Sequence, residues 1–262
     1  MEPYTAPPGA AWRLGRGPFI FSGFPPLCTG EIELLSASDE KVKIRSIAVV
    51  GRDQSPVLGA GDLRVGIALA PRERKRVSAH FVVEPHTAPG SYTVDLSCGD
   101  QSETAVVHVF EKLGVQIEPD VIQLRGAGGD VVEALVVITN RGNVSETLRD
   151  LVLVFLEEQN WVGRSMVHAL RETTADEGHQ SYLDRVLREL RSSIAHPARV
   201  NLRGEISEIR PGERRELRLE IKLPDELVKG RIYEGSTAFM SGELSFEVEC
   251  NGSSNSTKRR PR

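Results

Sequence analysis

The sequence predicts an all-β protein made of two tandem β-sandwich domains, the second of which carries a helical insertion. Three observations lead to this prediction: apolar and polar residues alternate along many short segments, turn residues separate those segments, and the stretch from Pro71 to Gly90 recurs from Pro211 to Gly230. Alternation with a period of two places one face of a strand on a core and the other in water. That pattern is typical of two antiparallel sheets packed face to face.

The recurring stretch keeps one offset, 140 residues, between its two copies. Pro71 and Glu73 correspond to Pro211 and Glu213. The apolar series corresponds in the same way: Leu69, Val77, Ala79, Phe81 and Val83 match Ile209, Leu217, Leu219, Ile221 and Leu223. A period of this length indicates two copies of one domain, because solenoid repeats are shorter.

The composition is that of a soluble globular chain long enough for two cores. Its 262 residues are 39% hydrophobic and 27% charged, and the net charge of −4 gives no electrostatic reason to expect nucleic acid as a partner. No apolar run is long enough to cross a bilayer. The first 27 residues lack the continuous apolar segment of a secretory signal, so we expect a cytoplasmic protein. A leaderless route to the cell surface is the alternative.

The proline-rich start predicts a flexible N-terminal arm over residues 1–16, followed by a first sandwich over 17–113. Phe19 and Phe21 give this region apolar surface to bury. They form either a first edge strand or a segment clamped against the sandwich. As part of an arm that adds itself to a partner, both residues are candidates for partner binding.

Short amphipathic segments then follow one another to Phe110, and a second sandwich is expected over 114–250. Gly126 to Asp130 is rich in glycine but lacks the Lys-Ser/Thr of a phosphate-binding loop. It precedes a β-branched segment rather than a helix, so it is expected to be an ordinary turn. The apolar run from Leu151 to Leu156 is expected to be a central strand.

Three turn motifs resemble those of the immunoglobulin-like accessory modules of bacteria and archaea. They are the strand ending VVITNRGNV at Val136 to Val144, Pro211-Gly212-Glu213 before an amphipathic strand, and Pro89-Gly90-x-Tyr92. The resemblance covers the second domain best and the first to a lesser extent, and it implies immunoglobulin-like β-sandwiches. Modules of that family serve as spacers, adhesive stalks or carriers beside catalytic domains. This chain departs from them because no signal peptide and no catalytic partner are seen.

A helical insertion interrupts the second copy over about residues 164–198. Ser181 and Asp184 match a capping box that would start a helix, and Pro197 would end it. Apolar residues recur at helical spacing, namely Tyr182, Leu183, Val186, Leu187, Leu190 and Ile194. This stripe either packs against its own sandwich or docks another protein. For docking, Tyr182, Val186, Leu190 and Ile194 are the candidate anchors.

No catalytic motif, cofactor loop or metal-binding spacing is found, so we expect no enzyme activity, cofactor or metal. Glu177 with His168, His179 and His196 is the most suggestive cluster, but it falls in what reads as a loop. Three cysteines are too few for a disulfide framework. Cys98 and Cys250 end alternating apolar segments and are expected to be free, buried thiols, rather than a bridge or a metal site. Residues 251–262 form a polar, basic segment that is expected to be a disordered tail.

The sequence therefore favours a non-catalytic structural or adaptor protein. Its partner is expected to be another protein or a second copy of itself, contacted through the inserted helix, a sheet edge or the N-terminal arm. The alternative function is a cell-surface accessory module that binds a ligand such as a carbohydrate. Only 5% of the chain is aromatic, which weighs against the flat aromatic platforms of sugar sites.

Overall fold

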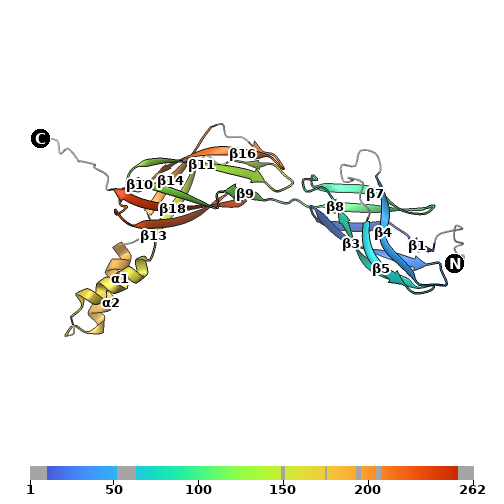
Figure 1. Ribbon diagram of the computed structural model, residues 1–262, viewed down its shortest axis with the longest axis horizontal. Helices are drawn as coiled ribbons and strands as arrows, with labels where there is room; N and C mark the ends of the chain where they lie inside the picture. Colours follow the sequence, from blue (N-terminus) through green and yellow to red (C-terminus); the bar gives the residue numbers. More distant parts are fainter. Residues whose placement is uncertain are drawn as a thin grey trace. The chain divides into compact units, whose positions relative to one another are not determined.

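A computed structural model describes residues 11–51, 63–148, 151–174, 176–192, 196–204 and 208–252. The chain divides into two compact units, and each has its own apolar core. Unit 1 comprises Met1–Leu113 with the short segments Arg141–Ser145 and Arg210–Gly212, and unit 2 comprises Gly114–Asn140, Glu146–Ile209 and Glu213–Arg262. Both units are built of strands, and the described helices belong to unit 2 (Figure 1).

The strands of unit 1 follow the predicted alternation. In β6, for example, Val77, Ala79 and Phe81 are buried while the residues between them are exposed. The strands are β1 Trp12–Leu14, β2 Phe19–Phe24, β3 Leu27–Ser36, β4 Val42–Gly51, β5 Leu63–Leu69, β6 Arg74–Val82, β7 Gly90–Cys98 and β8 Gln101–Val109.

The strand order of unit 1 is that of an immunoglobulin-like sandwich. Strand β2 runs parallel to β8, β7 joins β8 to β4, and β3 pairs with β6 over its length. This corresponds to the B–E and C–F–G pairings of the immunoglobulin fold. A tyrosine near the start of strand F is a further hallmark of that fold. Strand β7 occupies the position of strand F in unit 1, and the hydroxyl of its Tyr92 donates to the Ala88 carbonyl at 2.7 Å.

Unit 2 repeats this arrangement. Strand β10 runs parallel to β18, β17 joins β18 to β13, and β11 pairs with β16. The Tyr233 hydroxyl in β17 accepts a hydrogen bond from the Val228 amide at 2.9 Å. The strands are β9 Val115–Glu118, β10 Val121–Ala127, β11 Val131–Asn140, β12 Glu146–Thr147, β13 Leu151–Glu158, β14 His196–Arg203, β15 Glu208–Ile209, β16 Arg214–Lys222, β17 Ile232–Phe239 and β18 Gly242–Gly252.

The internal repeat is structural as well as sequential. Strands β6 and β16 begin at Arg74 and Arg214, which are 140 residues apart. The turns before them match too, because Arg72 and Gly212 both have positive φ, at 53° and 75°. Unit 2 places a glycine where this backbone conformation favours one, whereas unit 1 places an arginine there.

Two predicted boundaries are wrong. The arm was expected to extend to residue 16, but Trp12–Leu14 already forms β1 and pairs with β3. The tail was expected to begin at residue 251, but β18 continues through Gly252. Pairing with a neighbouring strand, which composition does not register, extends both elements. The rest of the predicted arm and tail, residues 1–10 and 253–262, lies outside the described residues.

The insertion contains two helices, α1 Trp161–Glu172 and α2 His179–Ser192, between β13 and β14. The sequence predicted only the second. Helix α2 begins at His179, before Ser181, so Ser181 lies in its first turn instead of capping it. Pro197 does not end the helix; it lies in β14 opposite Phe155. In the described part of the chain, neither helix is long and apolar enough to cross a membrane.

Candidate functional site

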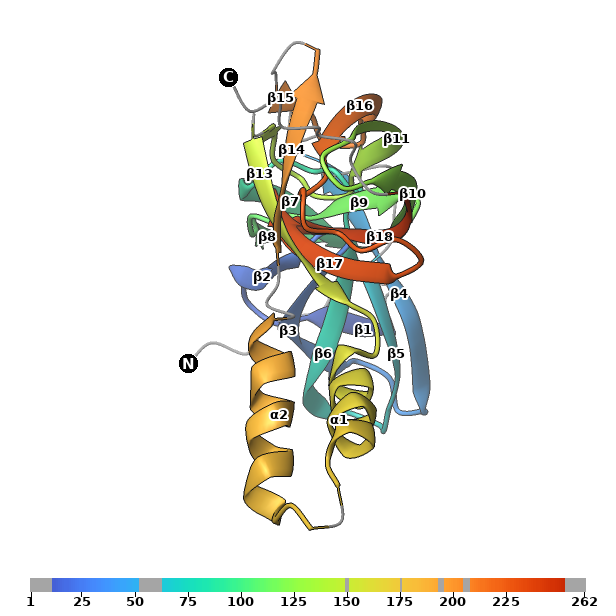
Figure 2. The same ribbon diagram turned by 90° about the vertical axis from the view of Figure 1, so that its left-hand side faces the viewer.

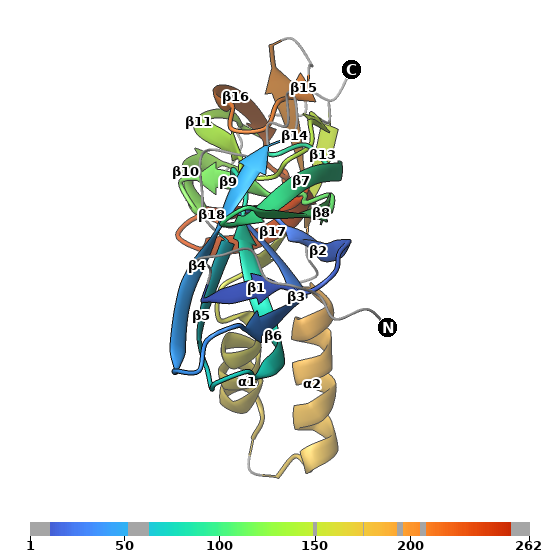
Figure 3. The same ribbon diagram turned by 90° about the vertical axis from the view of Figure 1, so that its right-hand side faces the viewer.

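The two inserted helices form an antiparallel hairpin that extends from the strands of unit 2 (Figure 1). Figures 2 and 3 show α1 and α2 side by side from opposite directions. Ser165 and Ala169 of α1 are fully buried, and Val186 of α2 is 8% exposed. Small residues in α1 let the two helices approach closely, so the hairpin has a packed seam of its own.

An ion-pair cluster joins the base of the hairpin to the sandwich. Glu158, at the end of β13, is only 8% exposed. Its carboxylate accepts hydrogen bonds from Arg164 of α1 at 2.8 Å and from Arg231, just before β17, at 2.7 Å. A nearly buried carboxylate with two guanidinium partners has its charge compensated. These contacts tie the first turn of α1 to two strands.

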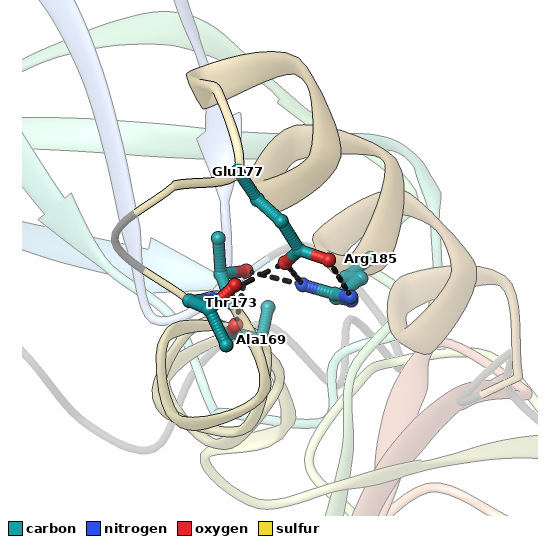
Figure 4. Close-up of polar contacts among 5 residues, drawn as sticks. Ala169, Thr173, Glu177 and Arg185 are labelled. Carbon is teal, nitrogen blue, oxygen red and sulfur yellow. Dashed lines mark hydrogen bonds and ion pairs between the residues drawn. The ribbon is translucent and has the colours of Figure 1, made fainter.

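A second polar cluster closes the tip of the hairpin (Figure 4). The Arg185 guanidinium donates to both oxygens of Glu177 and, at 2.9 Å, to the Thr173 hydroxyl. The Thr173 hydroxyl in turn donates to the Ala169 carbonyl at 2.7 Å, which satisfies a free carbonyl in the last turn of α1. The Arg185 guanidinium also holds the pKa of Glu177 below its ordinary value. Glu177 is therefore a structural ion-pair partner.

One side of the hairpin is polar. His168 of α1 lies 3.7 Å from a Glu172 oxygen and 3.8 Å from a Glu189 oxygen on α2. Arg185 belongs to the same side, since it lies one turn before Glu189 on α2. The contact between His168 and Glu189 bridges the two helices along this polar side.

The opposite side of the hairpin is apolar and exposed. We define the apolar face as Val162, Met166 and Leu170 of α1 with Leu183 and Leu187 of α2, whose exposures range from 46% to 68%. In each helix these residues recur every fourth position and therefore form a stripe along it.

Helical geometry places the two stripes on one surface. A helix turns by about 100° per residue, so both stripes lie on the same rotational side of the buried seam formed by Ser165, Ala169 and Val186. Because the helices run in opposite directions, equal rotation from the seam brings both stripes to the same face of the hairpin. Single exposed apolar residues are ordinary, whereas a continuous row on two packed helices is an exposed apolar patch.

The partner-binding residues predicted on α2 are mostly not exposed in the structure. Val186 is buried in the helix seam, and Tyr182 and Leu190 are half-buried along its edges. Ile194 lies outside the described residues. The predicted stripe is therefore largely the face that α2 turns to α1. The exposed residues are its neighbours Leu183 and Leu187 together with α1, whose own spacing of Val162, Met166 and Leu170 was the signal that sequence reasoning missed.

Phe19 and Phe21 are not available as a docking arm. Both lie in β2, which pairs with β3 and β8, and their exposures are 7% and 0%. The Phe21 ring packs against Phe81 with 5.8 Å between centroids. The sequence left open a first edge strand or a clamped segment, whereas β2 is an inner strand with a partner on each side and follows β1.

A groove lies beside the base of the hairpin on the outer side of the sheet of unit 2. Glu157 of β13 is the register partner of Glu234 of β17, which is the partner of Glu247 of β18, so three carboxylates stand in one row across three strands. We call this hollow the acidic groove; its volume is about 950 Å³. It is lined by Val121, Phe155, Glu157, Glu158, Gln159, Asn160, Trp161, Glu234, Gly235, Ser236, Ser245, Phe246 and Glu247.

The acidic groove combines charge with apolar surface. Phe155, one of the lining residues, is 58% exposed. Gln159 donates to a Glu234 oxygen at 2.7 Å. Like charges directly opposite one another on neighbouring strands repel, so this row costs stability unless something cationic or polar compensates it.

The other candidate chemical groups do not assemble. Cys98 and Cys250 are buried and unbridged, as predicted, and so is Cys28; burial raises the pKa of the Cys28 and Cys98 thiols. Thiols with a raised pKa are poor nucleophiles at neutral pH. Within the described ranges, no three histidine, cysteine or acidic side chains are arranged to hold a metal ion.

No protein-family model matches the chain, and no curated protein sequence matches it. Among solved structures, an I-band fragment of titin aligns over 92% of this chain and 65% of its own, at TM-score 0.33 and 10% identity. A protein of unknown function from Porphyromonas gingivalis aligns over 92% of this chain and 100% of its own, at TM-score 0.26 and 10% identity. The PapD-like domain 7 of human CEP192 aligns over 52% of this chain and 84% of its own, at TM-score 0.28 and 10% identity. The assignment of the immunoglobulin-like fold therefore rests on strand order and pairing.

Proposed function

We propose that this is a non-catalytic structural or adaptor protein that makes protein–protein contacts through the helical hairpin of unit 2. The observation that supports the proposal most directly is the apolar face. It is exposed on a hairpin that is already fixed at its base by Glu158 and at its tip by Glu177.

A pre-fixed apolar surface suits binding because little order is lost on association. Two pre-packed helices have already lost much of the conformational freedom that docking would otherwise remove. Completing the burial of one half-exposed leucine or methionine contributes about 1 kcal/mol. The five side chains of the apolar face together can therefore contribute about 5 kcal/mol, with the polar side of the hairpin left in solvent.

The asymmetry of the two units supports the same proposal. Unit 1 connects the corresponding strands, β4 and β5, without a described helix, whereas unit 2 places α1 and α2 between β13 and β14. Because both units contain the sandwich, the sandwich alone does not distinguish unit 2 from unit 1. The added hairpin is what distinguishes unit 2 and is therefore the better candidate for a function.

The test removes the hairpin and leaves the sandwich. Leu156 and His196 are register partners, so a short Asn-Gly-containing turn in place of residues 160–194 can connect β13 to β14. Cross-linking in the native host followed by mass spectrometry should lose its specific partners in this variant. The point variant Leu187→Ser should lose the same partners. Val167→Ser is the matched control, because Val167 is 50% exposed but points away from α2. An unchanged set of partners in both hairpin variants would refute the proposal.

The acidic groove favours a second candidate function, the binding of a hydroxyl-rich or cationic ligand such as a carbohydrate. Its row of glutamates and the exposed Phe155 ring together offer hydrogen-bond acceptors beside an apolar surface. Retention on polysaccharide resins should then be lost in Glu234→Gln and kept in Glu243→Gln, which removes a carboxylate from β18 outside the groove. Absence of retention on every resin would leave the hairpin as the candidate site.

A further inference from the structure

We propose that the occupant of the apolar face is the hairpin of a second copy of this chain, so that two hairpins form an antiparallel four-helix bundle. This inference rests on the proposed function, whose docking surface it uses, and it names the partner. The main support is that two copies of α2 packed in opposite directions bring leucine opposite leucine and acidic residues opposite basic ones.

The apolar side chains of α2 match under reversal. Leu183 and Leu187 are one turn apart on the same stripe and are 51% and 52% exposed. If a second α2 packs against the first in the opposite direction, with the two-fold axis passing near residue 185, Leu183 of each copy faces Leu187 of the other. Such a contact is isologous and closes at a dimer, without a free surface for further growth.

The charges on the edge of α2 match under nearly the same reversal. Asp184 and Arg188 are both exposed, and they lie next to the leucine stripe on the side of α2 away from α1. With the axis near residue 186, Asp184 of each copy lies opposite Arg188 of the other. Two equivalent ion pairs therefore flank the apolar contact, and they select the antiparallel direction because a parallel pairing would place like charges together.

Helix α1 completes the bundle. In the same antiparallel arrangement the stripe of Val162, Met166 and Leu170 meets its counterpart, since α1 and α2 present their stripes on one face. Four helices with antiparallel neighbours are the simplest arrangement in which both helices of a hairpin cover their apolar stripes at once. The polar side, with His168, Glu172 and Glu189, stays on the outside.

The test is sedimentation equilibrium of the full chain. We expect the wild-type protein to dimerise with a Kd in the micromolar range. Leu187→Lys should weaken the dimer at least about 30-fold, because it puts two charges into the apolar contact. Val167→Lys, which adds the same charge on the side of α1 away from α2, should leave the Kd within about twofold. Far-UV circular dichroism checks that each variant keeps its helices.

A charge-reversal cycle tests the arrangement. Asp184→Arg and Arg188→Asp should each weaken the dimer about fivefold, because each places like charges opposite one another. The double variant Asp184→Arg with Arg188→Asp should restore the wild-type Kd, because both ion pairs re-form with exchanged partners. A double variant that stays as weak as the single variants would overturn the antiparallel packing.

A wild-type chain that remains monomeric at about 100 µM, a hundredfold above a micromolar Kd, would overturn the inference. The two proposals fail separately. A monomeric protein whose cross-linked partners still depend on the hairpin refutes self-association and leaves the proposed function standing. A monomeric protein whose partners survive removal of the hairpin refutes both.

Discussion

At the scale of single residues, buried polar atoms show which positions the fold has fixed. Asn140 is fully buried, and its side-chain amide donates to the Ile209 carbonyl at 3.0 Å, so the asparagine that ends β11 is needed for a hydrogen bond as well as for a turn. Asn143 begins an Asn-Val-Ser sequence of the kind that can accept an N-linked glycan. It is also buried, and its side chain donates to the Thr87 carbonyl at 2.9 Å. In the folded protein that asparagine is unavailable to modification.

Ser165 is the opposite case. Its hydroxyl is fully buried in the hairpin seam, and no hydrogen-bond partner is found for it among the described residues. We expect Ser165→Ala to stabilise the hairpin by about 1 kcal/mol, because it removes an unsatisfied buried group and improves helix propensity. Urea unfolding followed by helical circular dichroism measures this. The reciprocal change Ala169→Ser should destabilise the hairpin, and stabilisation by both changes would contradict the explanation.

Glu158 supports the hairpin from the sandwich. Glu158→Gln removes the charge that Arg164 and Arg231 share and should cost about 2 kcal/mol of unfolding free energy. Glu157→Gln is the matched control, because that neighbour is exposed and its change should stay within about 0.5 kcal/mol. If chemical denaturation gives the same loss of unfolding free energy for Glu158→Gln and Glu157→Gln, the buried ion-pair cluster does not stabilise the protein specifically.

At the scale of elements, the hairpin is held by local polar contacts at both ends and by a narrow seam between them. Glu177 and Arg185 at the tip are partly exposed, so their pair is screened by solvent and contributes modestly. Its contribution depends on ionisation, which makes the tip of the hairpin sensitive to acid.

The direction of that dependence follows from the pKa of Glu177. Hydrogen bonds from Arg185 and from the Thr174 amide favour the ionised carboxylate and lower its pKa from the ordinary value of 4.5. The stabilisation is therefore fully present above pH 4.5 and is lost as the pH falls through the lowered folded-state value. The protection factors of the amides in the second turn of α2, which correct for the slower intrinsic exchange in acid, should fall in that range. Glu177→Gln should abolish this acid-dependent step, whereas Asp176→Asn should retain it.

At the scale of the whole molecule, the chain has two apolar cores with no shared residue. Phe21 belongs to the core of unit 1, where it is fully buried against Phe81. A core substitution in one unit should therefore act on that unit.

We expect Phe21→Ala to destabilise unit 1 by about 3–5 kcal/mol through loss of burial and a residual cavity. Hydrogen-exchange protection of β16, β17 and β18 in unit 2 should be unchanged. Ile20→Ala is the control, because Ile20 is 58% exposed in the same strand. Loss of protection in both units would contradict the separation of the two cores.

Much of this fold could be predicted because its signals are local. The period of two along segments such as Val77 to Val83, the Pro-Gly turns and the 140-residue repeat each depend on near neighbours in the chain, and they correctly predicted the immunoglobulin-like strands. The helical spacing of α2 was equally local. Helix α1 was missed although Val162, Met166 and Leu170 carry the same spacing.

The sequence by itself therefore determined most of the strands, with β1 and the start of β14 as exceptions, that a helix is inserted in the second copy, and that Cys98 and Cys250 are buried. Only the tertiary structure decided which side of α2 is buried, because that depends on where α1 packs. It also decided that Phe19 and Phe21 lie in a core, since burial of β2 requires β3 and β8 on either side. The row of Glu157, Glu234 and Glu247 likewise depends on register between strands that are distant in sequence, and periodicity within one strand carries no information about its neighbour.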